Sequence, residues 1–382
     1  MALKIAKRGS VAPFIVMDVL RAANQLEARG EHVIHLEVGQ PSTGAPKKVI
    51  KATQKALLGD KIGYTDALGI EPLRERIAQY YQDYYKVNVD PSRVVVTTGS
   101  SSGFLLSFLS AFEPGDKVGL TAPGYPAYRN ILQALGYEPV EIAVGPETHF
   151  QPTPQMLDNL DVTLDGLIVA SPGNPTGSML SRDDLKALCD YCDEKGIRFI
   201  SDEIYHGITY ENRADTAIEF SDSAILINSF SKYFSMTGWR LGWMIVPENM
   251  VRAIECLAQN LFISAPTLSQ LGGVAAFDAI EEADANVALY AKNREMLLNE
   301  LPGAGFDRLA PSDGAFYIYS DVAHLTNDAQ AFCQKILADT GVATTPGVDF
   351  DSQRGHRFMR FSYAGCFEDM VEATKRLKAY LK

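Results

Sequence analysis

Short apolar runs alternate with helix-like segments between residues 90 and 247. The runs comprise residues 93–98, 117–122, 166–171, 197–203, 224–230 and 242–247. They are continuously apolar and rich in β-branched residues, which is typical of strands buried on both faces. Segments with helical spacing and polar starts, such as residues 181–196, lie between several of them. The pattern predicts βαβ units, and therefore a mostly parallel sheet that is covered by helices.

The pattern changes after Pro247. Residues 267–300 are predicted to form a long helical stretch, followed by strands in GAFYIYS (314–320) and RFMRFSYA (357–364) and by helices at 327–339 and 367–381. The first 40 residues are predicted to hold a helix and a short strand that pack with this unit. We therefore predict an α/β fold with a large domain of residues 41–289, and a smaller α+β domain built from residues 1–40 and 290–382.

Length and charge narrow the class of protein. A chain of 382 residues exceeds the roughly 250–300 residues at which one core stops growing, which favours two domains. The net charge of −12 argues against nucleic acid or an anionic membrane as partner. Asp18 interrupts the apolar run near the N-terminus, which argues against a signal peptide, and no run reaches the ~18 apolar residues of a membrane span.

The five cysteines are odd in number and scattered, which predicts reduced thiols in a cytoplasmic protein. Cys189 and Cys192 form a CxxC pair of the kind found in zinc and redox sites. The pair lies inside a helical pattern and no second pair follows, so we predict that both residues are structural and that the protein holds no metal.

Polar groups follow four of the predicted strands. They are the GSSSG turn (99–103), the PGNPTG loop (172–177), Asp202 and Ser231-Lys232. In doubly wound sheets, ligands bind beyond the carboxyl ends of the strands. These groups are therefore expected to meet in one site.

The GSSSG turn has two interpretations. As a nucleophile elbow it would make Ser101 the nucleophile of an α/β-hydrolase, with His356 as a later histidine. As a Gly/Ser turn that opens a helix it would bind a phosphate with free backbone amides. The hydrolase interpretation leaves Lys232, Asp202 and the PGNPTG loop without a role.

Lys232 lies in an apolar, small-residue-rich segment, where a lone ammonium would be costly to bury. A buried lysine with a lowered pKa can form a Schiff base with a carbonyl. Asp202 could pair with a protonated ring nitrogen, and Arg240 could help the GSSSG turn to hold a phosphate. Together these groups predict a site for pyridoxal 5′-phosphate.

The chain also resembles the class I and II aminotransferases of fold type I along almost its whole length. The matching motifs include LEVGQPSTGAP (36–46), GYTDALGIEPLR (63–74), SPGNPTGS (171–178), SFSKYFSMTGWRLGW (229–243) and TTPGVDF (344–350). The resemblance implies the fold of that family, pyridoxal 5′-phosphate as cofactor and a ping-pong transfer of an amino group from an L-amino acid to a 2-oxo acid.

The resemblance also implies roles for single residues. Lys232 would form the Schiff base and shuttle the proton, Asp202 would pair with the ring nitrogen, and Tyr205 would bond the phenolic oxygen. The other residues implied to hold the cofactor are Asn174, Tyr125, Ser100, Ser101, Ser229 and Arg240. Tyr64 would reach the phosphate of a neighbouring subunit, which implies a homodimer with shared active sites. Arg360, Gly39 and Asn174 would bind the substrate, Arg360 through its α-carboxylate.

The substrate side chain stays open between aromatic, aliphatic and dicarboxylic amino acids. The GSSSG turn lacks a lysine and NLFISAP (260–266) lacks an arginine, so two family solutions for a distal carboxylate are missing. An apolar pocket is predicted from Phe14, Ile15, Phe262 and Ile263, while Arg354 or Arg357 could still receive a second carboxylate. A β-eliminating C–S lyase is the alternative that uses the same residues.

Overall fold

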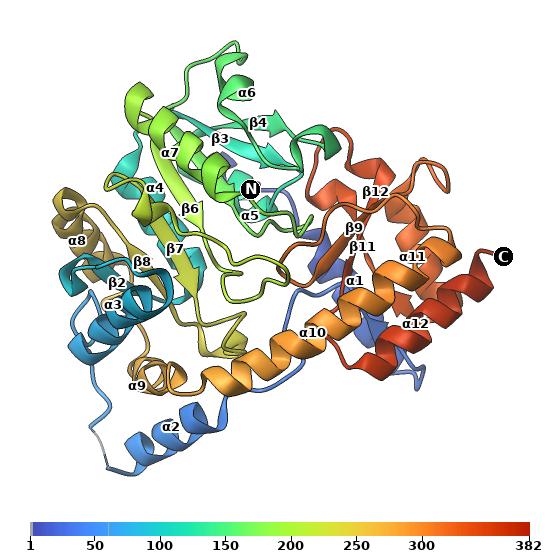
Figure 1. Ribbon diagram of the computed structural model, residues 1–382, viewed down its shortest axis with the longest axis horizontal. Helices are drawn as coiled ribbons and strands as arrows, with labels where there is room; N and C mark the ends of the chain where they lie inside the picture. Colours follow the sequence, from blue (N-terminus) through green and yellow to red (C-terminus); the bar gives the residue numbers. More distant parts are fainter. Residues whose placement is uncertain (1–2, 60) are drawn as a thin grey trace.

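The computed structural model describes residues 3–59 and 61–382 of the protein. In these residues a seven-stranded sheet forms the centre, with the strand order β2-β8-β7-β6-β5-β3-β4 (Figure 1). Its strands are β2 (Val94–Thr97), β3 (Lys117–Ala122), β4 (Glu138–Ala143), β5 (Gly166–Ala170), β6 (Arg198–Asp202), β7 (Ile225–Ser229) and β8 (Gly242–Ile245).

The sheet is parallel except for β8, which pairs antiparallel with both β2 and β7. All six apolar runs form strands, as predicted, and the mostly parallel arrangement is confirmed. Strand β4 was missed because it pairs only with β3 at the edge of the sheet and most of its residues are partly exposed. An edge strand of this kind lacks the continuous apolar run that marks a buried one.

Helices cover both faces of the sheet. α4 (Gly99–Ala111), α5 (Pro126–Leu135) and α8 (Val251–Leu261) cover one face, and α3 (Glu71–Tyr85) and α7 (Arg182–Lys195) cover the other. Neighbouring strand residues alternate between the faces: Val95 joins the cluster with α4, whereas Val94 and Val96 join the cluster with α3. Cys189 and Cys192 are free thiols in the core under α7, and burial raises the pKa of Cys192 to about 12. In the described part of the chain, no group of metal-ligating side chains forms a metal site.

The predicted helical stretch 267–300 is two helices, α9 (Thr267–Ala276) and α10 (Ile280–Glu300). The chain turns between them where Phe277, 6% exposed, enters an aromatic cluster with Phe230 and Trp243. α9 packs on α2 (Lys47–Gly59). α10 then runs from the central sheet to the second part of the molecule (Figure 1). The predicted domain boundary at residues 289 and 290 falls within this helix and stays a prediction.

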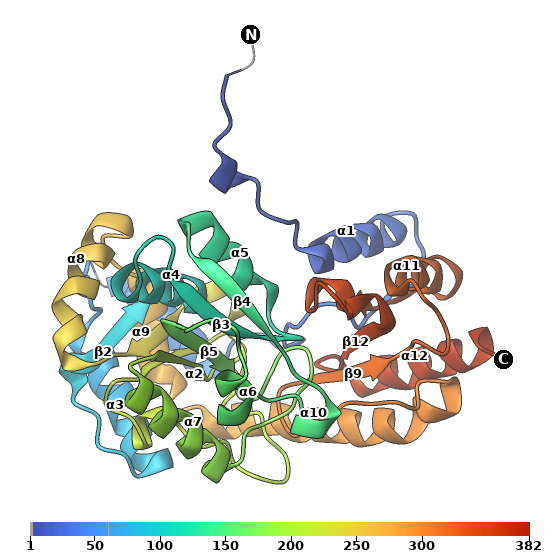
Figure 2. The same ribbon diagram turned by 90° about the horizontal axis from the view of Figure 1, so that it is seen from above.

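The second part of the molecule brings the two ends of the chain together. Strand β12 (Phe358–Ser362) lies between β11 (Thr345–Pro346) and β9 (Tyr317–Asp321). The predicted contact between the first 40 residues and the C-terminal part is confirmed, because β1 (Ile34–His35) pairs with β10 (Val342–Ala343). The helices here are α1 (Ile15–Glu27), α11 (Ala329–Thr340) and α12 (Phe367–Tyr380), with α1 beside α11 (Figure 2). The short helix α6 (Pro154–Asp158) packs on α7.

A bilayer needs a helix of about 20 apolar residues to span it. No helix within residues 3–59 and 61–382 is both long and apolar enough for that.

Candidate active site

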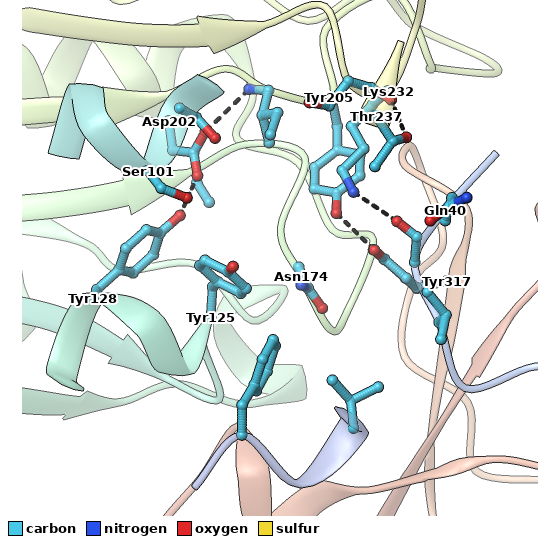
Figure 3. Close-up of a pocket in the computed structure, with 18 of the residues that line it drawn as sticks. Gln40, Ser101, Tyr125, Tyr128, Asn174, Asp202, Tyr205, Lys232, Thr237 and Tyr317 are labelled. Atoms are coloured by element: carbon cyan, nitrogen blue, oxygen red, sulfur yellow. Dashed lines mark hydrogen bonds between the residues drawn. The ribbon is translucent and has the colours of Figure 1, made fainter. Parts of the chain in front are cut away.

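A cavity of about 270 Å³ lies at the carboxyl ends of β6 and β7, beside the N-terminus of α1 (Figure 3). All the residues to which the family resemblance assigns a role line this cavity except Ser229 and Tyr64. Ser231, which the sequence placed beside Lys232, also lines the cavity, as do side chains that the sequence did not single out, namely Val16, Met17, Val38, Gln40, Phe104, Tyr128, Ile204, Thr237 and Tyr317. The crossover connections of a parallel sheet place the carboxyl ends of neighbouring strands together, which explains why motifs far apart in the sequence meet here.

Lys232 follows the end of β7, and its side chain points into the cavity (Figure 3). Its Nζ donates a hydrogen bond to the carbonyl of Gly39 at 2.6 Å. Burial and the positive charges of Arg360 and Arg240 lower the pKa of Lys232 to about 8, although the carboxylate of Asp202 opposes the shift. A neutral amine is therefore accessible near neutral pH, which a nucleophilic lysine requires.

Asp202 ends β6 and is buried, 4% exposed. Burial raises its pKa to about 6, against the hydrogen bonds from the Tyr128 hydroxyl and the Ile204 amide and the charge of Lys232. These donors stabilise the charged carboxylate in an otherwise apolar surrounding. Tyr128 was missed by the sequence reasoning, although it lies one helical turn after Tyr125 and thus on the same face of α5.

Two tyrosines meet beside Lys232. The hydroxyl groups of Tyr205 and Tyr317 are 2.6 Å apart, and burial raises the pKa of both. Gly39 lies directly against Tyr317, because a Cβ at position 39 would stand 1.8 Å from the Tyr317 hydroxyl. Only glycine therefore leaves room for this tyrosine pair. The aromatic strand motif GAFYIYS was the sequence signal for Tyr317, but it did not tell which aromatic faces the cavity.

Arg360 extends from β12 and is 2% exposed. Its Nη1 donates to Oδ1 of Asn174 at 2.8 Å, its Nη2 donates to the carbonyl of Glu37, and its Nε has no partner. In the described residues, no carboxylate lies within 4.0 Å of the guanidinium. A buried cation without a counter-ion is unfavourable, and guanidinium groups bind carboxylates in a bidentate fashion. Arg360 therefore offers a binding site for a carboxylate of a ligand.

The N-terminus of α4 forms an anion site together with Arg240. No side chain caps the helix, so its first backbone amides are free to bind a ligand. Gly99 has φ +72° and lies so close to Arg240 that a Cβ would stand 2.4 Å from Nη2. Ser100 and Ser101 line the cavity beside it. Free amides, the helix dipole and a guanidinium suit a phosphate group, so the donor set fits pyridoxal 5′-phosphate.

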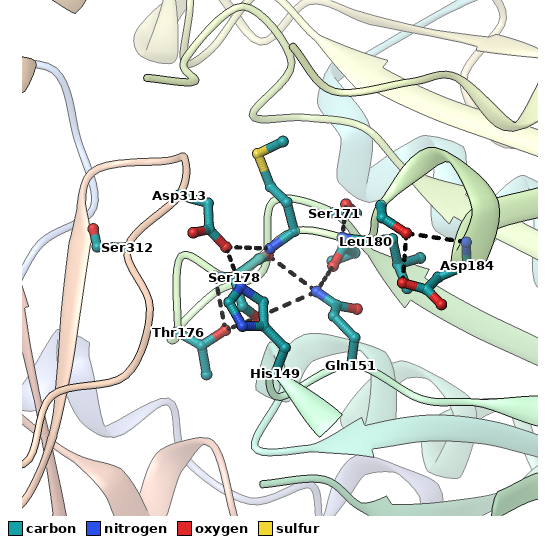
Figure 4. A network of polar contacts seen from close by, with 12 residues as sticks. His149, Gln151, Ser171, Thr176, Ser178, Leu180, Asp184, Ser312 and Asp313 are labelled. Carbon is teal, nitrogen blue, oxygen red and sulfur yellow. Dashed lines mark hydrogen bonds and ion pairs between the residues drawn. The ribbon is translucent and has the colours of Figure 1, made fainter. Parts of the chain in front are cut away.

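A polar network around Thr176 and Ser178 holds the loop that carries Asn174 (Figure 4). Gln151 donates to the carbonyls of Ala170 and Ser178 at 3.2 and 3.0 Å. Asp313 accepts from the amide of Met179 at 3.0 Å and pairs with His149 at 2.6 Å. These contacts fix both ends of the loop, and so they also fix the amide that orients Arg360.

Ser229 and Tyr64 lie outside the cavity. The Ser229 hydroxyl lies within hydrogen-bond distance of Ser231 Oγ (2.8 Å) and of the carbonyl of Leu241 (3.0 Å), whereas Ser231 lines the cavity. The Tyr64 residue is 83% exposed. Ser229 is thus in contact with a lining residue, and Tyr64 is free to contact a second molecule.

The apolar wall differs from the predicted one. Phe14 lines the cavity, but Ile15, Phe262 and Ile263 do not, and their places are taken by Val16, Met17 and Val38. For Ile15, the reason is that α1 begins at this residue, and its first turn directs residues 16 and 17 toward the cavity instead.

Neither arginine proposed for a distal carboxylate lines the cavity. Arg354 pairs with Asp351 at 2.8 Å, and Arg357 pairs with Asp321 at 2.5 Å. The lining cations are Lys232, Arg240 and Arg360. The described residues that line the cavity include no histidine either, so Ser101 lacks the histidine base that the hydrolase interpretation requires, and that interpretation loses its support.

Comparisons with known proteins agree with this geometry. Residues 31–376 match the family model of the class I and II aminotransferases. The chain is 51% identical over 382 residues to a valine–pyruvate aminotransferase of Mycobacterium tuberculosis, covering 99% of this chain and 98% of that protein. It is 36% identical to a (5-formylfuran-3-yl)methyl phosphate transaminase of Methanocaldococcus jannaschii, covering 96% of each chain. A crystal structure of an aminotransferase from Mycobacterium tuberculosis superposes with a TM-score of 0.98 at 50% identity, over 100% of this chain and 99% of that one.

Proposed function

The chain belongs to the class I and II aminotransferase family, and within that family we propose that it moves amino groups between L-amino acids with apolar side chains and pyruvate. The protein is an aminotransferase that uses pyridoxal 5′-phosphate. The observation that carries the proposed substrate class is that buried Arg360 has no carboxylate partner and shares its cavity with an apolar wall.

The residues around the cavity suit each part of the cofactor. When bound, pyridoxal 5′-phosphate supplies an aldehyde that condenses with amines and a ring that withdraws electrons from the carbon next to the nitrogen. The amides of α4 and Arg240 would bind its phosphate, and Asp202 would bind its ring nitrogen. The further residues that we propose to hold it are Asn174, Tyr205, Tyr125, Ser100, Ser101 and, through its contact with Ser231, Ser229.

Lys232 is the amine and base of the proposed mechanism. Its pKa of about 8 leaves a fraction of Nζ unprotonated near neutral pH, and this form can accept the proton from the substrate α-carbon. With the cofactor bound, the same Nζ would pass this proton on to it, and in the second half-reaction, with the 2-oxo acid, Nζ would deliver a proton to the α-carbon of the product amino acid. The hydrogen bond to the Gly39 carbonyl orients Nζ between transfers.

Arg360 orients the substrate by its α-carboxylate. Nη1 is already held by Asn174 and Nη2 by the Glu37 carbonyl, so the guanidinium is preorganised rather than ordered on binding. The cavity also has Gly39 beside Lys232, where its backbone can contact the same carboxylate. Fixing the carboxylate in this way fixes which bond of the α-carbon faces Lys232.

The pocket for the side chain supports an apolar substrate. It is lined by Phe14, Val16, Met17 and Val38. Among the described residues, the cations that line the cavity are Lys232, Arg240 and Arg360, and each of them already has a role in binding the cofactor or the α-carboxylate. A second carboxylate would therefore be buried without a partner, which is unfavourable. Similarity to a valine–pyruvate aminotransferase supports valine as donor and pyruvate as acceptor.

The test is a panel of donors and acceptors with the holoenzyme. Valine and phenylalanine are compared with aspartate as donors, each with pyruvate and with 2-oxoglutarate. We expect kcat/KM for valine with pyruvate to exceed that for any pairing that includes a dicarboxylate. A preference for aspartate or 2-oxoglutarate would contradict the proposed substrate class. Release of pyruvate from a sulfur amino acid without any acceptor would instead support the C–S lyase.

We also propose that the enzyme is a cytoplasmic homodimer. Several large apolar side chains close to Tyr64 in the sequence are exposed, among them Leu57 (59%), Leu58 (91%) and Ile62 (43%). Exposed apolar side chains favour association, and a second copy is the simplest partner. If Tyr64 contributes to the phosphate site of the partner, cofactor affinity must fall on dilution to monomers. Unchanged affinity in a monomer proven by sedimentation would contradict this role. The free thiols support a reducing compartment.

A further inference from the structure

Helix α1, whose first residues line the substrate cavity, has no capping side chain of its own. Phe14 is its N-cap residue, and its side chain carries no oxygen that could accept a hydrogen bond. The backbone amides of Ile15 and Val16 donate instead to Oδ1 and Oδ2 of Asp349, at 3.2 and 3.1 Å. Asp349 belongs to the short 3-10 helix η8 (Gly347–Asp349), 333 residues beyond Val16. The cap of α1 thus comes from the other end of the chain.

Asp349 is 2% exposed, and no Lys, Arg or His nitrogen of the described residues lies within 4.0 Å of its carboxylate. Burial raises its pKa, while the two amides of α1 and the more distant charges of Arg360 and Arg129 oppose that shift. A buried carboxylate needs donors, and here the N-terminus of a helix supplies them together with its dipole. The contact is therefore a strong tether between η8 and α1.

The residue after Asp349 contacts the carboxylate-binding arginine. The Cζ atom of Arg360 lies 4.8 Å from the centroid of the Phe350 ring. One segment of two residues thus contacts α1 on one side and Arg360 on the other. This arrangement links the position of the substrate carboxylate to the position of α1.

The first turn of α1 presents Phe14, Val16 and Met17 to the cavity. The Phe14 ring also meets the Tyr125 ring edge-on, with centroids 5.9 Å apart. Because position 14 is used for this contact, a Ser, Thr or Asp cap at that position would remove part of the wall. A cap from η8 allows the helix to begin with apolar residues at the cavity.

We propose that Asp349 is a positioning residue that sets the distance between Arg360 and the apolar wall, and thereby lets the enzyme distinguish a branched side chain from the methyl group of alanine. The inference rests on the proposed function, because it places an apolar substrate side chain against α1. Without the cap, the first turn of α1 frays and the wall recedes from a branched side chain. Alanine is too small to depend on that wall.

The test compares Asp349→Ala with the wild-type holoenzyme, using valine and alanine as donors. We expect the ratio of kcat/KM for valine to that for alanine to fall about five- to tenfold, as the loss of one helix cap predicts. Asp349→Asn keeps one of the two acceptor oxygens, so its ratio of kcat/KM for valine to that for alanine is expected between those of the wild type and Asp349→Ala. If Asp349→Ala does not fold, Asp349→Asn is the variant to be tested.

A binding measurement without turnover provides the second readout. The dissociation constants of 3-methylbutanoate and propanoate report the carboxylate site with and without a branched side chain. The ratio of these constants must shift in Asp349→Ala by a factor similar to that found in the kinetics. Asp351→Ala is the matched control, since Asp351 is also 2% exposed but pairs with Arg354 and not with α1.

The outcomes separate this inference from the proposed function. A wild-type enzyme that does not use valine contradicts the proposed substrate class. In another outcome, the wild-type enzyme uses valine while Asp349→Ala lowers kcat/KM for valine and alanine by the same factor, so that their ratio does not change. That result overturns only the role of Asp349. A shift of the ratio in Asp351→Ala as large as that in Asp349→Ala would likewise overturn it.

Discussion

The two sides of the active-site cavity are built in different ways. On the cofactor side, Asp202 is the last residue of β6, and Lys232 and the GSSSG turn come within three residues of the ends of β7 and β2. On the side-chain side, the wall is a helix turn whose position depends on Asp349, more than 300 residues away. The strand ends of the central sheet thus bring the reactive groups together through local motifs, whereas the position of α1 determines which substrate side chain fits. Substitutions at α1 can therefore alter the choice of substrate without altering the reaction.

The largest effect is expected on the cofactor side. Lys232→Ala removes both the amine and the base, so kcat should fall by at least about 10⁴-fold. Folding should persist, because the lysine is a buried amine whose charge burial already disfavours. Lys186→Ala is the control, since Lys186 is an exposed lysine paired with Asp190 on α7. An active Lys232→Ala enzyme in single-turnover kinetics would break the assignment.

Arg360 lies where the two sides meet. In Arg360→Lys the charge remains but the bidentate geometry and the contacts to Asn174 and Glu37 are lost, so kcat/KM should fall about 100-fold for every amino acid. Steady-state kinetics with valine and alanine should show equal losses, in contrast to Asp349→Ala. Arg357→Lys, at an arginine paired with Asp321 outside the cavity, should change little. A loss confined to valine would show that Arg360 acts on the side chain instead.

A smaller effect is expected at Tyr128. Because burial raises the pKa of Asp202 to about 6 and the Tyr128 hydroxyl opposes that shift, Tyr128→Phe should raise this pKa further. The carboxylate that binds the ring nitrogen is present above its pKa, so cofactor affinity should decline on acidification, and the decline should begin at higher pH in the variant. A lost hydrogen bond to a charged group predicts a displacement of about one to two pH units. Fluorescence titration of cofactor binding against pH measures it, and coincident profiles would contradict it.

The smallest effect concerns the amine itself. In the cofactor-free protein, acylation of Lys232 by a lysine reagent should follow the neutral form, with a midpoint near its pKa of about 8. Asp202 raises this pKa, so Asp202→Asn should move the midpoint to lower pH. Peptide mass mapping of the modified fraction gives the profile. A midpoint near 10.5, the ordinary value for lysine, would show that the cavity does not perturb Lys232.

The strand ends of the central sheet could be predicted from the sequence, and the long-range contacts could not. Buried strands have continuous apolar runs, so the sheet and the polar groups at its strand ends were accessible from pattern alone. The partly exposed edge strand β4 carried no such run and was missed. The break between α9 and α10 was also missed, because it results from the packing of Phe277 and not from a Gly or Pro.

Details of the site depended on tertiary packing. Tyr128 could have been found from its spacing to Tyr125 on one helix face. Ser231 lines the cavity in place of Ser229 because of how the chain turns after β7. The alternation of side chains along a strand does not extend past the end of β7, so it could not predict this. The contact of Asp349 with α1 joins residues at opposite ends of the chain, and no local pattern signals it.

The central claim is that the amine of Lys232 takes the cofactor. Treating the holoenzyme with borohydride and mapping its peptides by mass spectrometry tests this most directly. We predict an added mass of one reduced cofactor on the peptide that contains Lys232, and no such addition in Lys232→Ala. An addition on another lysine, or none in a preparation that holds bound cofactor, would contradict the account.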